Sequence, residues 1–362
     1  NTCAFIKPAK DEAVKTLKEM AKWKKKGKCK HLIAAGCLPE RYKEELPALL
    51  PEVDAFIGVP KEFQVPKIKA TPSWTAYLKI SEGCNNCCTY CTVPSIRGRL
   101  RHKKPADIVN EAKLLVKTGV KEIILVAEET TMYPNFPKLL KKLCKIPKLR
   151  WIRIMYAHPK HVSAEMIAVM AKEPKIVKYL DLPIQHASDK ILRLMNRRYT
   201  RQDLVELIDK IRRKIPQIAL RTSVIVGFPG ENEAEFQELL AFIKQVKFQK
   251  LGVFTYSQEE GTPASKMRGQ VSAKIKSKRF QQVMQAQNKI SKELNEKMVG
   301  LTLETIIEGA NIGRSYMDAP DIDGQVIINS TKSLSPGEIK QVRITGSRAY
   351  DLIGLPTGRQ VC

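Results

Sequence analysis

The sequence lacks the features that mark membrane-spanning or exported proteins. Its 362 residues contain no apolar run of membrane-spanning length, and no secretory signal precedes the first predicted domain. Acidic residues are scarce beside basic ones, 37 against 63. The length is enough for two or three domains, and the hydrophobic content of 43% is enough for a substantial core. We therefore expect a cytoplasmic globular protein with no membrane partner.

The excess of basic residues gives a formal net charge of +26. Such a charge fits a generally Lys-rich surface, and it equally fits an anionic partner such as the ribosome or RNA. Charge by itself does not choose between these two interpretations.

Cysteine usage points to metal binding. The chain has nine cysteines, an odd number, and four of them fall within eight residues: Cys84, Cys87, Cys88 and Cys91. In a chain without an export signal this pattern favours a metal site in a reducing cytoplasm over a disulfide framework.

The spacing C-x3-C-x2-C of Cys84, Cys88 and Cys91 places three thiolates on one short loop. Three thiolates hold three corners of a cubane [4Fe-4S] cluster and leave the fourth iron open to a ligand, whereas an electron-carrying cluster has four protein ligands. A zinc site is the alternative, but it normally takes four N or S ligands. The remaining nearby thiol, Cys87, adjoins Cys88 and is poorly placed to share its metal. We therefore expect the cluster, with Cys87 as a bystander.

The chain reads as α/β over most of its length. From 73 to about 260, strand and helix patterns alternate, which predicts six βα units forming a parallel sheet and a partial barrel. The expected strands are 76–81, 122–127, 151–156, 178–184, 219–226 and 250–256, and the expected helices include 107–118, 233–246 and 271–298. The cluster loop follows the first of these strands, at the end where α/β sites lie.

Smaller regions flank this barrel. Residues 1–60, with a helix expected over 11–26 and a strand over 32–35, read as the remainder of an α/β domain that lacks its first strand and helix. Cys3 and Cys37 each border a β-like element there, so we expect them at a shared strand edge. The Pro- and Lys-containing stretch 61–72 reads as a linker. Residues 297–362 have short β-like runs and Gly turns, which predicts a small five-strand β-barrel.

The charge of this predicted barrel differs from that of the whole chain. Between 297 and 362 there are seven basic residues (297, 314, 332, 340, 343, 348 and 359) and seven acidic ones (304, 308, 318, 321, 323, 338 and 351). A barrel that grips RNA is expected to share the positive excess. This one is neutral, which favours a protein partner.

Six motifs are spread in order over essentially the whole chain. They are Ile80-Ser81-Glu82-Gly83-Cys84, Cys91-Thr92-Val93-Pro94-Ser95-Ile96-Arg97-Gly98, Leu182-Pro183-Ile184-Gln185-His186-Ala187-Ser188-Asp189, Val226-Gly227-Phe228-Pro229-Gly230-Glu231, Tyr256-Ser257-Gln258-Glu259-Glu260-Gly261-Thr262-Pro263 and Asp318-Ala319-Pro320-Asp321-Ile322-Asp323-Gly324. Together they resemble the radical S-adenosylmethionine methylthiotransferases, and within them the branch that modifies a ribosomal-protein aspartate.

The resemblance implies three domains: a truncated flavodoxin-like methylthiotransferase domain (1–60) with an auxiliary [4Fe-4S] cluster, a TIM-like radical SAM barrel (73–296), and a TRAM β-barrel (297–362) that recognises the substrate. It implies two [4Fe-4S] clusters and S-adenosylmethionine as cofactors. It also implies a small-subunit ribosomal protein as substrate, with a methylthio group added to the β-carbon of an aspartate, and an electron donor of the flavodoxin or ferredoxin type. The cofactor would supply a 5′-deoxyadenosyl radical, because no general base removes hydrogen from that carbon.

The resemblance also suggests which residues contact the cofactors. Cys84, Cys88 and Cys91 would hold the radical cluster, and Cys3 and Cys37 would match two of the three auxiliary ligands, the first of which would lie upstream of Asn1. Contacts with S-adenosylmethionine are expected from seven side chains or turns: Tyr90, Glu128, Gln185, Ser188, Arg221, Gly227 and Glu231. Each has a structural alternative, such as core packing for Tyr90, an ordinary βα turn for Gly227 and Glu231, and a buried ion pair for Arg221.

Two further departures from the family pattern stand out. Glu128-Glu129 occupies a position where the family usually has Gln-Asp, and the loop after Tyr133 is shorter than usual. Two other functions remain open. One is a tRNA adenosine methylthiotransferase, against which the neutral barrel argues but which the net charge of +26 keeps open. The other is a ribosome-associated binding protein that has lost its auxiliary cluster.

Overall fold

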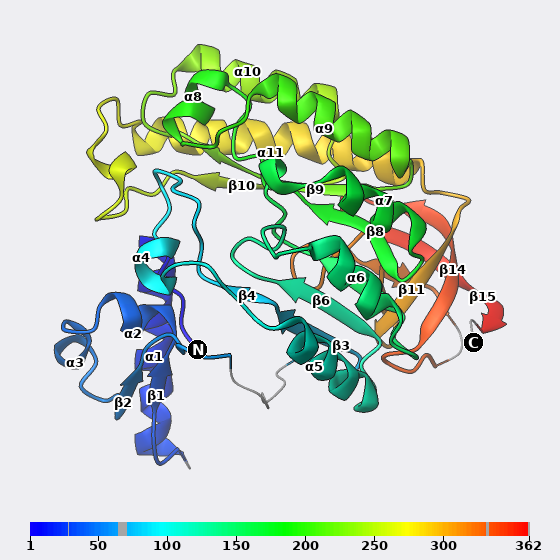
Figure 1. Ribbon diagram of the computed structural model, residues 1–362, viewed down its shortest axis with the longest axis horizontal. Coiled ribbons are helices and arrows are strands. Elements are labelled where there is room, and N and C mark those ends of the chain that lie inside the picture. The colour runs from blue at the N-terminus through cyan, green and yellow to red at the C-terminus, as the bar shows by residue number, and fades with distance from the viewer. Residues whose placement is uncertain (28, 64–70, 331–332, 361–362) are drawn as a thin grey trace. The chain divides into compact units, whose positions relative to one another are not determined.

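The structure is a computed structural model that describes residues 1–27, 29–63, 71–330 and 333–360 (Figure 1). The chain divides into two compact units. The first unit combines Asn1–Ile68, Ser81–Lys103 and Ser257–Arg268. The second combines Lys69–Ile80, Lys104–Tyr256 and Gly269–Cys362. Residues 64–70 of the expected linker lie outside the described residues.

The first unit contains a small α/β layer. Its elements are α1 (Lys7–Lys26), β1 (Ile33–Ala35), α2 (Cys37–Arg41), α3 (Leu46–Leu49) and β2 (Ala55–Ile57). Strands β1 and β2 pair in parallel, and a bridge between Thr2 and Gly36 extends the pairing. Helix α1 begins at Lys7, four residues before the expected start, because Pro8 stands in its first turn, where the missing N–H costs nothing.

The same unit carries the cysteine loop and a short later segment. The loop lies between β4 (Ser81–Glu82) and α4 (Val93–Arg97), and β5 (Arg101–His102) pairs antiparallel with β4. The later segment contains the 3-10 turn η2 (Pro263–Lys266).

The second unit is built on a six-stranded parallel sheet in the order β10-β9-β8-β7-β6-β3. Its strands are β3 (Thr75–Lys79), β6 (Glu122–Val126), β7 (Trp151–Ile154), β8 (Ile176–Asp181), β9 (Ala219–Val226) and β10 (Lys250–Thr255). The connecting helices are α5 (Pro105–Lys117), α6 (Phe136–Cys144), α7 (Ala164–Lys172), α8 (Asp189–Leu194), α9 (Arg201–Lys214) and α10 (Glu233–Val246), with a 3-10 turn η1 (Pro159–His161). This arrangement confirms the predicted partial barrel of six βα units.

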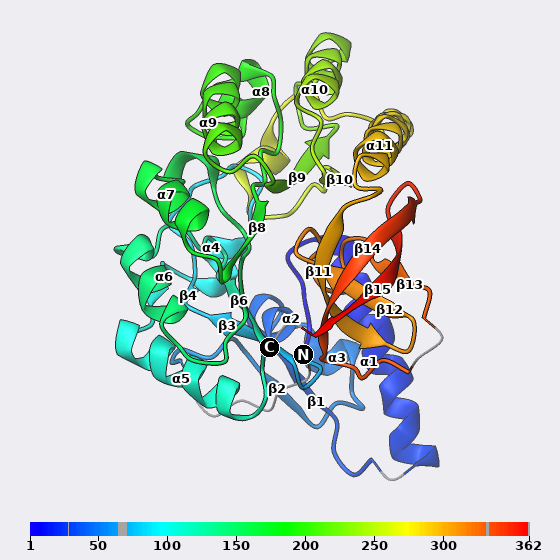
Figure 2. The same ribbon diagram turned by 90° about the vertical axis from the view of Figure 1, so that its right-hand side faces the viewer.

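The helices cover one face of this sheet, which we call the outer face (Figure 2). Apolar residues that alternate along the strands, among them Leu78, Ile123 and Leu220, pack there against the helices in the largest core cluster. Helices α9 and α10 begin with capping boxes, at Thr200–Asp203 and Asn232–Glu235, which satisfy their first backbone N–H groups.

Residues beyond 300 form a closed five-stranded barrel, as the sequence predicted. It follows the long helix α11 (Ala273–Glu296) and contains β11 (Thr302–Gly309), β12 (Ile312–Ser315), β13 (Val326–Ile328), β14 (Ile339–Ser347) and β15 (Leu352–Gln360). The barrel lies on the inner face of the sheet, opposite the helices (Figure 2). A shared core joins the two, with Ile124, Trp151 and Tyr179 from the sheet packed with Ile306 and Met317 from the barrel.

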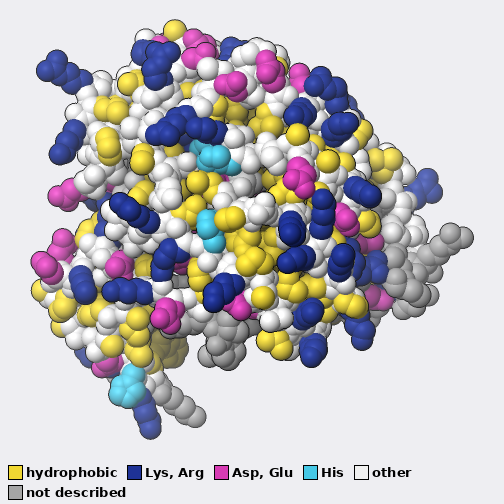
Figure 3. Space-filling model, in the orientation of Figure 1, with side chains coloured by type: hydrophobic (Ala, Val, Ile, Leu, Met, Phe, Trp, Pro, Cys, Tyr) yellow, Lys and Arg dark blue, Asp and Glu magenta, His cyan; other side chains and the backbone are white. Residues whose placement is uncertain are grey.

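Charged side chains are not gathered in one place on the face that Figure 3 shows. On the face seen in Figure 3, Lys and Arg side chains are distributed over many elements, with Asp and Glu among them. No helix of the described residues is both long enough and apolar enough to cross a membrane.

Candidate active site

The cysteine loop begins with a glycine that nothing larger can replace without strain. Gly83 has φ +78°, and a Cβ there would lie 2.5 Å from the carbonyl oxygens of both Gly98 and Arg99. Directly after it, Cys84 N–H donates to the Gly98 carbonyl at 3.2 Å. The first cysteine is therefore fixed by close backbone packing that needs a glycine before it.

The three spaced cysteines are half-buried, and backbone N–H groups face two of their sulfurs. Asn86 N–H lies 3.4 Å from Cys84 Sγ, and Val93 N–H lies 3.4 Å from Cys91 Sγ. Cys87, by contrast, is exposed. Thiolates with N–H donors around them are the donor set of an iron–sulfur cluster. The loop fits such a cluster in donor type and in the sequence spacing of its cysteines. Among the described residues, no three metal-ligating side chains converge on one point.

The structure brings the two auxiliary candidates to one strand edge, as the sequence predicted. Thr2 N–H donates to Ala35 O at 2.7 Å, and Cys37 N–H donates to Thr2 O at 3.1 Å. Cys3 and Cys37 thus lie one residue beyond the paired positions Thr2 and Gly36. Cys3 is exposed and Cys37 is buried.

Arg97 connects this edge with the strand that leads into the cysteine loop. Its Nη2 lies 3.0 Å from Cys37 Sγ, and its Nη1 lies 3.1 Å from Glu82 Oε1. A guanidinium beside a sulfur favours the thiolate, the form that binds metal. Arg97 is the middle residue of the Ile96-Arg97-Gly98 run. A residue to which the sequence analysis assigned no role thus contacts a candidate ligand.

Glu259, in the segment Ser257–Arg268 of the first unit, contacts residues near the N-terminus. Its carboxylate accepts from Lys7 N–H at 2.7 Å and from Arg41 Nη1 at 3.0 Å. Ala264 N–H donates to Thr89 O, in the cysteine loop, at 2.9 Å. Three segments far apart in the sequence thus build the surroundings of the loop, including Tyr90, which is half-buried there.

In the second unit, the turn after β9 is organised by Glu231. Its Oε2 accepts from Gly227 N–H at 2.8 Å and Phe228 N–H at 3.2 Å, and its Oε1 accepts from Arg279 Nη1 at 2.8 Å. His186 Nε2 lies 3.6 Å from Glu231 Oε2, and both side chains are fully buried. Gly227 has φ +73°. The carboxylate of Glu231 is thus used within the protein, and backbone atoms of the turn are the groups it positions.

The residues after β8 take a strained path beside β9. Gln185 has φ +66°, and its backbone pairs with β9 through Ser223 O at 2.9 Å and Ile225 N–H at 2.8 Å. Ser188 is buried, and its N–H donates to His186 Nδ1 at 3.0 Å. A non-glycine residue at positive φ is costly and is often found at functional sites.

Glu128 and Glu129 follow β6 but have different surroundings. Glu128 lies 3.8 Å from Lys79 Nζ. Glu129 is buried and accepts from Thr131 N–H at 2.8 Å, and its Oε2 lies 2.9 Å from His161 Nδ1. Glu129 therefore holds its own loop, and Glu128 is the more accessible of the two.

Arg221, from the middle of β9, is held by two carboxylates. Its Nη1 donates to Asp181 Oδ1 at 2.8 Å, and its Nε lies 3.5 Å from Asp323 Oδ1 in the C-terminal barrel. Burial opposes the charge, but Asp181 and Asp323 raise the pKa of Arg221 above its usual range. The buried ion pair given as the structural alternative is therefore present.

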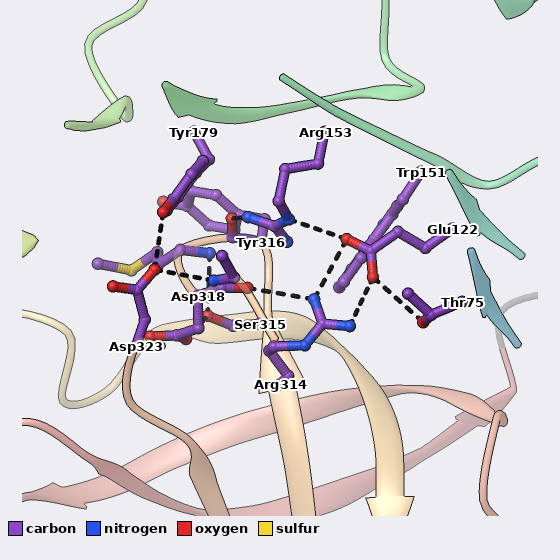
Figure 4. Close-up of polar contacts among 12 residues, drawn as sticks. Thr75, Glu122, Trp151, Arg153, Tyr179, Arg314, Ser315, Tyr316, Asp318 and Asp323 are labelled. Atoms are coloured by element: carbon purple, nitrogen blue, oxygen red, sulfur yellow. Dashed lines mark hydrogen bonds and ion pairs between the residues drawn. The ribbon is translucent and has the colours of Figure 1, made fainter. Parts of the chain in front are cut away.

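A second ionic group joins the sheet to the C-terminal barrel (Figure 4). Glu122, at the start of β6, accepts from Arg153 Nε at 2.9 Å and from Arg314 Nη1 at 3.2 Å. All three side chains are almost completely buried. Burial opposes ionisation of Glu122, but Arg314 and Arg153 hold its pKa below the usual value.

Sequence reasoning missed this group and Arg279. The available signal was an ionisable residue inside an otherwise apolar strand, as in Glu122-Ile123-Ile124-Leu125-Val126 and Trp151-Ile152-Arg153-Ile154. Such a residue needs a buried partner of opposite charge. The partner of Glu122, Arg314, lies 192 residues away, so local pattern could not find it.

Comparison with known families matches this architecture. The Radical SAM superfamily profile matches residues 78–243, the TRAM domain profile matches 299–356, and the profile of uncharacterized protein family UPF0004 matches 1–58. Fold and loop together define a radical S-adenosylmethionine enzyme with a C-terminal TRAM domain.

Curated relatives narrow this class. The chain is 44% identical to ribosomal protein uS12 methylthiotransferase RimO of Lachnoclostridium phytofermentans, over 98% of this chain and 90% of the relative. It is 43% identical to the protein of the same name from Geobacter sulfurreducens, over 98% of this chain and 88% of the relative. The chain belongs to the RimO family of radical S-adenosylmethionine methylthiotransferases. Membership implies a [4Fe-4S] cluster and S-adenosylmethionine as cofactors.

Among solved structures, coproporphyrinogen III oxidase (HemN) from Escherichia coli has a TM-score of 0.49 and 16% identity. The match covers 75% of this chain and 66% of that chain. The family assignment rests on the sequence relatives and not on this likeness.

Proposed function

We propose that this protein adds a methylthio group to the β-carbon of an aspartate in the small-subunit ribosomal protein uS12. The observation that carries the proposal is the 44% identity to a protein named for that activity, over 98% of this chain. The neutral charge count of the C-terminal barrel supports a protein substrate over tRNA, because a barrel that binds RNA is expected to be basic.

In this proposal, Cys84, Cys88 and Cys91 hold the radical cluster, and Cys3 and Cys37 contribute to an auxiliary [4Fe-4S] cluster. The cluster and S-adenosylmethionine, when bound, supply the radical chemistry that an unactivated C–H bond requires. Gly83 fixes the start of the loop, and Arg97 Nη2 lies 3.0 Å from Cys37 Sγ.

Residues at the strand ends of the sheet would position S-adenosylmethionine. The backbone of Gly227, which Glu231 holds in place, would contact the adenine side of the cofactor. Gln185 and Ser188 would contact its ribose or its carboxylate. Glu128 would meet the amino group. Tyr90 would pack on the adenine ring. Arg221 would face the carboxylate of the cofactor while it stays paired with Asp181 and Asp323.

The remaining partners follow from this substrate. We infer that the enzyme acts in the cytoplasm, where ribosomal proteins are made and assembled. We also infer that a flavodoxin- or ferredoxin-type protein supplies the electrons.

The test is mass spectrometry of uS12 and of tRNA after anaerobic incubation with reconstituted enzyme, S-adenosylmethionine, a sulfide source and reductant. A methylthio mass increase on uS12 is expected, and it should vanish with Cys88→Ser but persist with Cys87→Ser. A mass increase on tRNA alone would overturn the proposed substrate in favour of the tRNA-modifying alternative. Intact binding to ribosomes without any modification would favour a non-catalytic role.

A further inference from the structure

The inner face of the sheet is accessible along its last two strands. Leu220, Val224 and Val253 pack in the outer core, so the side chains that alternate with them point to the inner face. These inner-face positions are Arg221, Ser223 and Ile225 on β9, which pair in register with Lys250, Gly252 and Phe254 on β10. Phe254 is 51% exposed, and Ser223 and Gly252 are half-buried. A ligand can therefore reach this part of the face.

The guanidinium of Arg221 has one nitrogen left for a ligand. Nη1 donates to Asp181 Oδ1 at 2.8 Å and lies 3.4 Å from Ser223 Oγ, and Nε lies 3.5 Å from Asp323 Oδ1. Asp323 also accepts from Tyr179 OH at 2.7 Å (Figure 4). Nη2 carries two N–H groups, and within the described residues neither has a hydrogen-bond partner. Because two carboxylates hold the guanidinium, these donors keep one direction.

Gly252 leaves space beside these donors. A Cβ at this position would lie 3.5 Å from Arg221 Nη2, 3.6 Å from Phe254 Cε2 and 3.8 Å from Ser223 Oγ, all ordinary van der Waals distances. Gly252 does not have a positive φ, so the strand does not need a glycine for its backbone conformation. A glycine inside a strand often marks the close approach of a ligand or of another backbone. Here a charged donor, a hydroxyl and an exposed aromatic ring surround the space that the glycine leaves.

The charges around this space disfavour phosphate. Asp318 Oδ1 lies 2.6 Å from Lys250 Nζ on the same face. Asp181 and Asp323 add two carboxylates, and Arg221 adds one cation. Three carboxylates thus stand against two cations, although the whole chain has a net charge of +26. A phosphate would be repelled here, whereas a neutral oxygen acceptor such as a peptide carbonyl would not.

We propose that the space at Gly252 binds a backbone carbonyl of the polypeptide substrate. Arg221 Nη2 and the Ser223 hydroxyl donate to the carbonyl oxygen, and the Phe254 ring packs against the apolar part of the same substrate segment. The second N–H of Nη2 remains available for the cofactor carboxylate. The inference rests on the proposed function and adds to it the residues that hold the substrate. We call these four residues the Gly252 cradle.

Gly252→Ala in the reconstituted holoenzyme tests the cradle, because the added methyl group fills the space without a clash. Binding of uS12, measured by fluorescence anisotropy, should weaken about tenfold, and KM for uS12 should rise by the same factor, through loss of a hydrogen bond from a charged donor. The affinity for S-adenosylmethionine and the midpoint of urea unfolding should stay at their wild-type values. Gly346→Ala, on β14, is the matched control, since its new Cβ has only Ile353 within 4 Å, and uS12 binding should be unchanged.

Ser223→Ala tests the same space without adding volume to it. Loss of the hydroxyl should weaken uS12 binding about threefold and leave the affinity for S-adenosylmethionine unchanged. Unchanged uS12 binding in both variants would overturn the cradle. A loss confined to the affinity for S-adenosylmethionine would overturn it too, as would weaker binding of tRNA with uS12 binding intact.

The binding measurement separates this inference from the proposed function. If wild-type enzyme transfers no methylthio group to uS12 while Gly252→Ala still binds uS12 about tenfold more weakly, only the proposed reaction is overturned. If wild-type enzyme modifies uS12 and Gly252→Ala does so with the same KM, only the cradle is overturned.

Discussion

Arg314 Nη1 of the C-terminal barrel lies 3.2 Å from Glu122 Oε1 at the start of β6, and both side chains are almost fully buried. Arg153 Nε approaches the same carboxylate at 2.9 Å. The barrel is thus joined to the inner face of the sheet by a buried ionic group as well as by apolar packing.

Replacing Glu122 by Gln should destabilise the second unit strongly. The change leaves Arg153 and Arg314 without a buried counter-charge, which typically costs about 3–5 kcal/mol. Urea unfolding measures the loss. Lys141→Ala, which removes the exposed pair with Glu165, is the control and should cost less than about 1 kcal/mol. Equal unfolding midpoints for Glu122→Gln and wild type would contradict the role of this group.

Replacing Gly83 by Ala should prevent the cysteine loop from holding its cluster. The added Cβ meets two carbonyl oxygens at 2.5 Å, and the positive φ adds about 1–3 kcal/mol of strain. Iron content and visible absorbance after anaerobic reconstitution should fall to a small part of the wild-type values. Gly309→Ala, where the new Cβ meets nothing within 4 Å, should retain full iron. A Gly83→Ala protein with the wild-type iron content would show that the loop can bind its cluster with a different backbone conformation at residue 83.

Glu231→Gln separates a structural from a cofactor-binding role for this carboxylate. Because Glu231 is fully buried and paired with Arg279, its neutralisation should cost about 3–5 kcal/mol in urea unfolding. Affinity for S-adenosylmethionine, measured by calorimetry, should fall together with stability, because Glu231 acts on the cofactor only by holding the backbone of the turn at Gly227. Glu238→Gln, exposed on α10, should change neither quantity. Unchanged stability with lost affinity would instead mean direct contact with the cofactor.

His158 should make stability depend on pH. Burial, with Arg197 and His161 nearby, lowers the pKa of His158 to about 2 from an ordinary 6.5. The unfolded chain therefore binds a proton below pH 6.5 that the folded protein does not, so stability is complete above that pH and falls on acidification. The slope from this residue is about 1.4 kcal/mol per pH unit between pH 6 and 3.

His158→Asn keeps an acceptor for Lys160 N–H and removes the titration. The difference in unfolding free energy between wild type and variant should therefore shrink as pH falls from 6.5 to 4. A constant difference for His158→Asn would mean that His158 binds its proton equally well in the folded and unfolded states, which would contradict the lowered pKa.

Much of the fold followed from local pattern. The helix over 233–246 and the strand over 219–226 have the predicted bounds, because apolar periodicity and capping residues act over a few positions. The strand edge shared by Cys3 and Cys37 also followed from the sequence, because each cysteine borders a β-like element. The binding of a cluster by Cys84, Cys88 and Cys91 stays a prediction. The roles of Glu231 and Arg221 could not be assigned in this way, since each depends on a partner from another element.

The sequence by itself indicated the class of chemistry, because the C-x3-C-x2-C spacing of three cysteines predicts a cluster ligand set from local sequence alone. It also determined the α/β alternation, because each βα unit carries its own periodicity. Only the tertiary structure decided that Asp318 and Asp323 are anchors while Asp321 is free, although all three lie in one motif. The reason is physical: the fate of a carboxylate is set by the cation or hydroxyl that folding brings to it, and Lys250, Tyr179 and Arg221 come from strands far away in the chain.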